Sequence, residues 1–219
     1  MSNAIGDERI SAAMPTAART VWKMHPLANP NAAASAAPSN TGSYAVAATP
    51  ARYALERGAW GDAASLQVRP TRYAYADAMT WFARALGSAR THDPAGVKTA
   101  IDELQKGIDR LTQEKETYWA EQVTIQKIAA TAWLALAEGR SSDALSSMRE
   151  AADREDRTEK SAVTPGPLAP ARELLGDMLV ELNRPAEASV EYRATLLKEP
   201  GRRHALSRVA KAASRDEER

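Results

Sequence analysis

From residue 50 onward, apolar side chains recur every three or four positions with polar side chains between them. This spacing places the apolar residues on one face of a helix, so it predicts a series of amphipathic helices. Glycine and proline interrupt the pattern at intervals, as is typical of helix ends. The helices are predicted at residues 52–58, 61–68, 71–90, 94–111, 118–138, 141–157, 168–182, 185–198 and 203–214. We find no convincing β-strand pattern.

Residues 24–51 have a different composition from the rest of the chain. They are mostly Ala, Pro, Ser, Asn and Thr, and they carry no charged side chain other than His25, taken as neutral. Their four prolines predict that this window forms no helix. Ser2-Asn3-Ala4 is typical of the remnant of a purification tag, and residues 8–24 could form a short helix. We therefore expect residues 1–49 to be a tag remnant and a flexible arm, and residues 50–219 to be the folded domain.

Composition supports an all-α fold and excludes several kinds of site. The chain has 46 alanines against nine valines, six isoleucines and one phenylalanine, so residues that favour strands are scarce. Without any cysteine, it cannot form a disulfide scaffold, a thiolate zinc site, an iron–sulfur cluster or a cysteine nucleophile.

The charge balance and hydropathy give no sign of nucleic acid or membrane as a partner. The 29 basic and 28 acidic residues give a net charge of +1, which is too small for a global attraction to either. No stretch approaches the roughly 18 to 20 apolar residues of a membrane span. The start of the chain has no pattern of a secretory leader, so a cytoplasmic location is expected.

Two of the predicted helices, at 168–182 and 185–198, form a pair across a tight turn. This pair resembles a tetratricopeptide repeat, with matching residues at the family's spacing: Leu175, Gly176, Leu179, Ala188, Tyr192 and Pro200. Small Gly176 and Ala188 let the two helices approach each other, and Tyr192 fills the space beside them. Arg172 stands where the family often has a tryptophan.

Weaker copies of the same pattern precede this pair. The equivalent small residues are Ala63, Val97, Ala144 and Ala188, which are separated by 34, 47 and 44 residues. Since the family's period is about 34 residues, the longer intervals indicate insertions near 111–119 and at 158–167. The resemblance covers about residues 50 to 215, and within it the runs 118–123 and 164–168 are similar to little-characterised bacterial proteins of this class. It implies an all-α, right-handed solenoid of about four helix pairs with a terminal capping helix, but no activity.

In such a solenoid, the first helix of each pair lines a concave groove where partner peptides bind. Trp119, Gln122, Gln126 and Trp133 lie on one stripe of the predicted helix 118–138. Tryptophan offers rigid contact area, and glutamine can both donate and accept hydrogen bonds. These four residues are therefore predicted groove residues, followed by Met79 and Phe82 from the second repeat. The alternative is that Trp119 and Trp133 pack between repeats.

Three carboxylates, Glu173, Asp177 and Glu181, share one face of the next repeat. They could bind a basic peptide or a cationic ligand. Alternatively, the following helix supplies Lys211 and Arg215 as partners for Asp177 and Glu181, in exposed ion pairs of at most about 1 kcal/mol each. Glu173 then has no evident partner, so it is added to the predicted groove.

Other charged or stiff segments have simpler interpretations. The loop 158–167 contains two prolines and could cover the groove as a lid, or it could be a tolerated surface insertion. The run 153–157 alternates in charge and is interpreted as an exposed helix end. The last helix is basic but has no aromatic residue for base stacking, so a solvated capping helix is expected rather than a nucleic-acid surface.

Catalysis has little support in the sequence. The three histidines are far apart, and the chain has no metalloprotease, nucleophile-elbow, P-loop or dinucleotide motif, so neither a metal nor a cofactor is expected. We predict a non-catalytic scaffold or adaptor that binds a peptide or helix of a partner protein in the groove. One alternative is self-association: if upstream repeats are missing, the N-terminal face would expose Trp60, and a homodimer would cover it. Another is a small-ligand pocket with the proline-containing loop as its roof.

Overall fold

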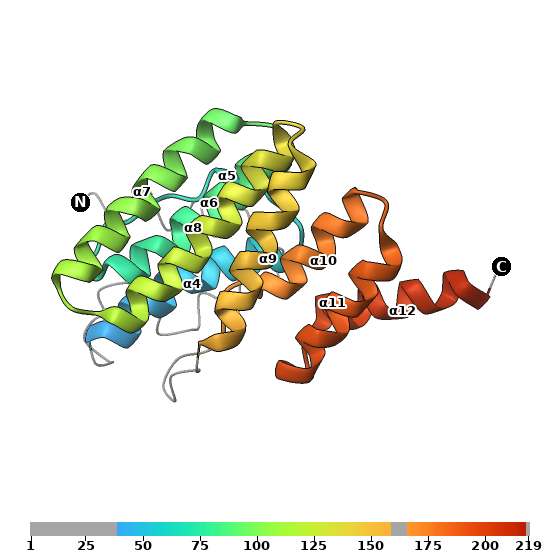
Figure 1. Cartoon of the computed structure of the whole chain (residues 1–219). Coiled ribbons are helices and arrows are strands. Elements are labelled where there is room, and N and C mark those ends of the chain that lie inside the picture. Colours follow the sequence, from blue (N-terminus) through green and yellow to red (C-terminus); the bar gives the residue numbers. More distant parts are fainter. Residues whose placement is uncertain (1–38, 159–165, 218–219) are drawn as a thin grey trace.

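The computed structural model describes residues 39–158 and 166–217. These residues form helices and no strand, which confirms the all-α prediction (Figure 1). The helices are α4 (Ser39–Glu56), α5 (Trp60–Ala64), α6 (Ala74–Arg90), α7 (Pro94–Gln113), α8 (Thr117–Ala137), α9 (Ser141–Arg157), α10 (Ala171–Glu181), α11 (Pro185–Lys198) and α12 (Arg203–Glu217).

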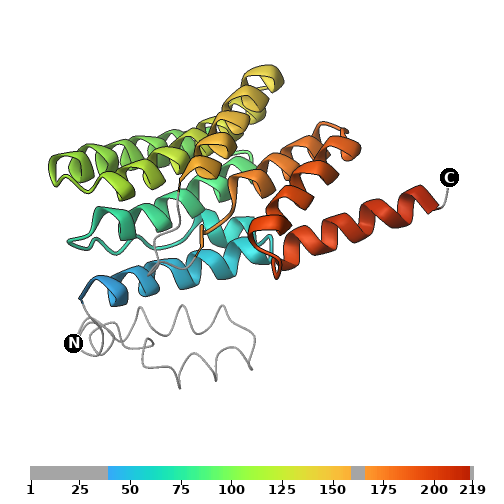
Figure 2. The same cartoon turned by 60° about the horizontal axis from the view of Figure 1, so that its bottom comes forward.

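The helices pack sequentially in pairs. The pairs are α4–α5, α6–α7, α8–α9 and α10–α11, here called the first to fourth pair, and α12 follows them (Figures 1 and 2). The first helices of the first three pairs also pack on one another, since α4 contacts α6 and α6 contacts α8. In contrast, α8 and α10 touch only slightly. The third and fourth pairs therefore meet mainly through α9 and α10.

One turn geometry recurs between the helices of each pair. Gly58, His92, Gly139 and Asn183 have left-handed backbone angles, with φ between 58° and 79°. In each turn, the N–H of the following residue donates to the carbonyl five positions before it, as in a Schellman motif. Lys115, between α7 and α8, adopts the same geometry. The four turns within pairs are separated by 34, 47 and 44 residues, the same intervals that the sequence predicts.

Small residues stand at fixed distances from these turns. Five positions after each turn lies a buried small residue, and seven positions before it lies another. At Gly176, an added Cβ would lie 2.7 Å from Cε1 of Tyr192, so only glycine allows this approach of α10 and α11. The predicted contact of Gly176 with Tyr192 is thus confirmed. The two sets are Ala63, Val97, Ala144 and Ala188 after the turns, and Ala51, Ala85, Ala132 and Gly176 before them.

The prediction that residues 24–51 form no helix is wrong for residues 39–51. Helix α4 runs from Ser39 through Pro50 to Glu56. Proline removes one helical hydrogen bond, but α4 packs along α6 and buries Tyr44, Ala48, Ala51 and Leu55, which outweighs that loss. The folded region therefore begins before residue 50. Residues 1–38, with the expected tag remnant, arm and short helix at 8–24, lie outside the described residues.

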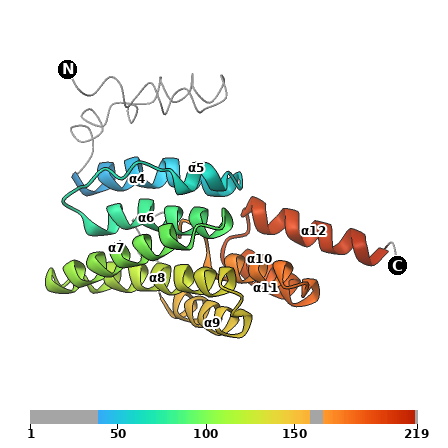
Figure 3. The same cartoon turned by 90° about the horizontal axis from the view of Figure 1, so that it is seen from above.

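Ion pairs and hydrogen bonds attach the start of α12 to the first helices of two pairs. Arg202, just before α12, pairs with Glu173 of α10 and with Glu56 of α4. The far end of α12 projects away from the other helices (Figures 2 and 3). Within the described residues, no helix is both long and apolar enough to cross a membrane.

Candidate binding pocket

A partly enclosed pocket of about 320 Å³ lies between the third and fourth helix pairs. Helix α8 forms one wall, and the ends of α9 and α11 form another. Residues 166–168 and Pro170, just before α10, also line it, and α4 and α6 contribute one side chain each. The lining residues are Tyr44, Met79, Tyr118, Trp119, Gln122, Gln126, Glu155, Asp156, Thr158, Gly166, Pro167, Leu168, Pro170, Arg172, Ala194, Thr195, Lys198 and Glu199.

Aromatic rings hold one side of the pocket in place. The indole of Trp119 stacks on Tyr75, with ring centroids 4.2 Å apart and an interplanar angle of 12°. Tyr44 packs against Trp119 at 5.9 Å, and Tyr118 meets it edge-on at 5.1 Å. Because these contacts come from α4, α6 and α8, the Trp119 side chain is held before any ligand binds.

Two glutamines on α8 offer polar groups to the pocket. Gln126 is only 9% exposed, and its Nε2 donates to Sδ of Met79 at 3.8 Å. Its Oε1 atom is buried and accepts no hydrogen bond in the described part of the chain. Gln122, one helical turn earlier, lines the same pocket. These two amides can therefore bind an incoming group.

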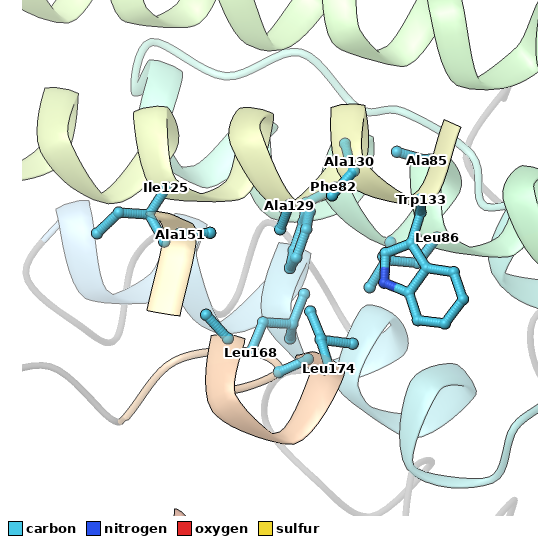
Figure 4. Close-up of a cluster of buried hydrophobic side chains, with 14 of the residues drawn as sticks. Phe82, Ala85, Leu86, Ile125, Ala129, Ala130, Trp133, Ala151, Leu168 and Leu174 are labelled. Carbon is cyan, nitrogen blue, oxygen red and sulfur yellow. The ribbon is translucent and has the colours of Figure 1, made fainter. Parts of the chain in front are cut away.

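Beyond Gln126 the pocket narrows into a crevice of about 10 Å³. Its walls are mainly apolar, from Phe82, Ile125, Ala129, Leu168 and Leu174 (Figure 4). This volume is close to the minimum that holds one water molecule. The deep end of the site is thus closed by the hydrophobic core, and a ligand enters only as far as Gln126.

Glu155 places a carboxyl group beside the glutamines. Its Oε1 accepts a hydrogen bond of 2.9 Å from the N–H of Ala171, the first residue of α10. Burial raises the pKa of Glu155 to about 7, since it outweighs the hydrogen bond from Ala171, and the carboxylates of Glu199 and Asp156 add to the rise. The interpretation of residues 153–157 as a fully exposed helix end is therefore wrong for Glu155, because the start of α10 covers it.

The cations that line the pocket are already paired with carboxylates. Arg172 bonds to Asp153, Asp156 and Glu191 at 2.7 to 2.9 Å. Lys198 bonds to Asp156 at 2.7 Å. Neither cation is therefore available to bind an anion without losing these contacts.

The proline-containing segment before α10 is fixed to the first helix pair. Arg52 of α4 donates to the carbonyl oxygens of Gly166 at 3.0 Å and Pro167 at 3.2 Å. Leu168 is buried next to them. The described end of the loop thus lines the pocket, while residues 159–165, the rest of the predicted lid or surface insertion, lie outside the described residues.

The structure brings together four of the predicted groove residues, Trp119, Gln122, Gln126 and Met79, at this pocket. Phe82 lies in the crevice below them. Trp133 does not reach the pocket. It is 3% exposed in the core near Leu86, and Arg90 lies 4.6 Å from its ring centroid (Figure 4). Trp133 thus follows the alternative interpretation, in which it packs between repeats.

Glu173 also lies elsewhere, and the prediction that it has no partner is wrong. Both of its oxygens accept from Arg202, at 2.8 to 3.1 Å. Asp177 accepts from Tyr192 at 2.7 Å and lies 2.9 Å from Nε2 of His204, and Glu181 pairs with Arg90 at 2.5 Å. Cations from the second pair and from the start of α12 therefore neutralise this carboxylate face.

Sequence reasoning missed Tyr44 and Glu155. A signal existed for Tyr44, because Ala51 and Ala63 have the same twelve-residue spacing as Gly176 and Ala188. This spacing assigns residues before position 50 to the first pair. For Glu155 no such signal exists, since its neighbours in sequence are charged on both sides.

Comparisons with protein-family models, with curated proteins and with solved structures found no match to this chain. Among the described residues, no group of three or more His, Cys, Asp or Glu side chains is placed to hold a metal ion.

Proposed function

We propose that the chain is a non-catalytic, tetratricopeptide-like scaffold that binds a segment of a partner protein between its third and fourth helix pairs. The first helices of the pairs form the inner face of a right-handed solenoid, and α12 caps its end. The recurring turn and the two sets of small residues support this architecture, because each pair repeats the same local geometry at matching positions.

The observation that carries the binding proposal is the buried Oε1 atom of Gln126, which has no hydrogen-bond donor among the described residues. A buried polar atom left in this state costs about 1–3 kcal/mol of stability. Such a cost is explained when a ligand supplies the missing hydrogen bond. Together with Gln122, this side chain can read the N–H and C=O groups of an extended peptide.

The aromatic wall supports the same interpretation. Trp119 is held between rings from three helices, so its side chain loses little freedom when a ligand binds. Rigid aromatic side chains in partly enclosed pockets are typical anchors for a partner protein.

A peptide array tests this proposal. The wild type, Gln126→Met and the control Gln113→Met are applied to capped octapeptides of varied sequence. Gln113 is exposed at the end of α7, away from the pocket. We expect the wild type and Gln113→Met to bind the same peptides, and Gln126→Met to lose them. Equal binding by all three proteins, or no binding by any, contradicts the proposal.

A small ligand is the second candidate, because the pocket volume lies at the lower end of small-molecule sites and residues 166–168 border it. This candidate is supported if a small polar compound raises the melting temperature of the wild type but not that of Gln126→Met. Self-association has less support, since Trp60 is half-buried with Arg90 4.7 Å from its ring centroid and is not an exposed anchor.

A further inference from the structure

The pocket has an excess of acidic groups. Carboxylates reach it from α9, as Glu155 and Asp156, and from Glu199 at the end of α11. The cations in the lining are Arg172 and Lys198, and both are hydrogen-bonded to Asp156. An anion in the pocket is therefore repelled by three carboxylates, whereas a cation is attracted by them.

Glu155 is the carboxylate that lacks a cation. Its one hydrogen bond is from the neutral backbone N–H of Ala171, and it forms no ion pair with a described residue. Gln126, whose buried Oε1 is unsatisfied, lines the same pocket and the same crevice. Both side chains thus carry acceptor oxygens; Glu155 already accepts from Ala171, whereas Oε1 of Gln126 is buried without a donor among the described residues.

The opposite wall is also suited to a cation. The Trp119, Tyr118 and Tyr44 rings line the pocket, and an ammonium or guanidinium group is attracted to the face of such rings by about 0.5–2 kcal/mol. A carboxylate on one side, with aromatic rings and amide oxygens on the other, provides surroundings in which proteins hold a desolvated cation.

Resting on the proposed function, we propose that the pocket binds the positively charged side chain of a lysine or arginine on the partner segment. The ammonium or guanidinium group donates to the Glu155 carboxylate and to Oε1 of Gln126, and the aliphatic part of the side chain packs on Trp119. Gln122 is then placed to bond with the peptide backbone next to that side chain.

This arrangement couples binding to the ionisation of Glu155. The groups that face it are Asp156 on α9, Arg172 and the N–H of Ala171 on α10, and Lys198 and Glu199 on α11. The α8 wall contributes the neutral Gln122 and Gln126. With a pKa of about 7, roughly a tenth of Glu155 is ionised at pH 6 and most of it at pH 8. Affinity for a cation should therefore fall about tenfold from pH 8 to pH 6.

The test is an NMR titration with three capped alanine pentapeptides whose central residue is lysine, norleucine or glutamate. The indole N–H of Trp119 and the side-chain amides of Gln122 and Gln126 report binding, including weak binding. The proteins are the wild type, Glu155→Gln and the control Glu150→Gln. The glutamine at 155 still accepts from Ala171, and Glu150 lies on the exposed face of α9 outside this pocket.

At pH 8 we expect the lysine peptide to bind wild type and Glu150→Gln about tenfold tighter than the norleucine peptide. This preference should be lost in Glu155→Gln and should shrink at pH 6 in the wild type. If lysine and norleucine bind equally to the wild type, or if glutamate binds best, the inference is overturned while the proposed function stands. If no peptide shifts any of these signals, the inference and the proposed function both fail.

Discussion

Glu155 accepts a hydrogen bond of 2.9 Å from the backbone N–H of Ala171, so the end of α9 caps the start of α10. The residue before α10 is Pro170, whose side chain has no hydrogen-bonding group for this task. A carboxylate at this position is also favoured by the positive end of the helix dipole. The same side chain lines the pocket, so one residue serves both the contact between two helix pairs and the candidate site.

The stability of the protein should depend on pH through Glu155. Burial raises the pKa of Glu155 from 4.5 to about 7 in the folded state, so its contribution to stability is present below pH 4.5 and lost as the pH rises through 7. Glu155→Gln keeps the acceptor and removes the charge. From pH 5 to pH 8, the unfolding free energy of the variant relative to wild type should rise by about 2–3 kcal/mol. Urea unfolding of both proteins at pH 5 and at pH 8 measures this change. If the stability difference between Glu155→Gln and wild type is the same at both pH values, the prediction is contradicted.

His204 gives a second pH dependence, at the attachment of α12. The hydrogen bond to Asp177 raises the pKa of His204 above 6.5, although burial opposes the shift. The stability from this pair is therefore complete below pH 6.5 and is lost as the pH rises through the raised pKa. In a Glu155→Gln background, His204→Asn should be more destabilising at pH 6 than at pH 9. Equal destabilisation at both pH values, measured by urea unfolding, counts against a charged pair.

The buried ion pair of Arg202 with Glu173 should dominate the docking of α12. The two side chains are only 9% and 5% exposed. Arg202→Met leaves Glu173 buried without a cation, so we expect a loss of about 3 kcal/mol. The double variant Glu173→Gln/Arg202→Met should recover at least half of that loss, because no buried charge remains. Arg203→Met, at an exposed neighbouring position, is the control and should change stability by less than about 0.5 kcal/mol.

Position 176, where α10 and α11 approach each other closely, should tolerate only glycine. In Gly176→Ala the new Cβ would lie 2.7 Å from the Tyr192 ring, so we expect a loss of about 1–3 kcal/mol in unfolding free energy. Gly61→Ala in α5 meets no atom within 4 Å and should be neutral or stabilising by up to about 1 kcal/mol. If Gly176→Ala and Gly61→Ala change the melting temperature by the same amount, α10 and α11 do not make this tight contact.

Helix positions were largely predictable from the sequence because local signals determine them. Helices α9 and α11 have the predicted bounds, and Pro94 and Pro185 begin helices as expected. Helix α4 was not predictable from local signals, since it contains Pro50 and carries few charges. Its stability comes from packing along α6, which is a contact between distant residues.

The candidate site was predictable only where it lies on one helix. Helical spacing alone places Trp119, Gln122 and Gln126 on one face of α8. The same stripe extends to Trp133, but there Arg90 and the core cover it. The place of Glu155 in the pocket depends on how α9 packs against α10. The ion pair of Glu173 depends on where the start of α12 lies. Such contacts follow from the arrangement of whole helices rather than from residue spacing.

The unfolding free energy of Gln126→Met tests the central claim most directly, with Gln113→Met as the control. If Oε1 of Gln126 has no hydrogen-bond donor until a ligand binds, its replacement by methionine, a residue of similar size, should stabilise the free protein by about 1 kcal/mol. This stabilisation corresponds to a melting temperature about 2–4 °C higher. The same variant should lose peptide binding. If Gln126→Met is instead less stable than the wild type, a bound water or another donor already satisfies Gln126, and its role is structural.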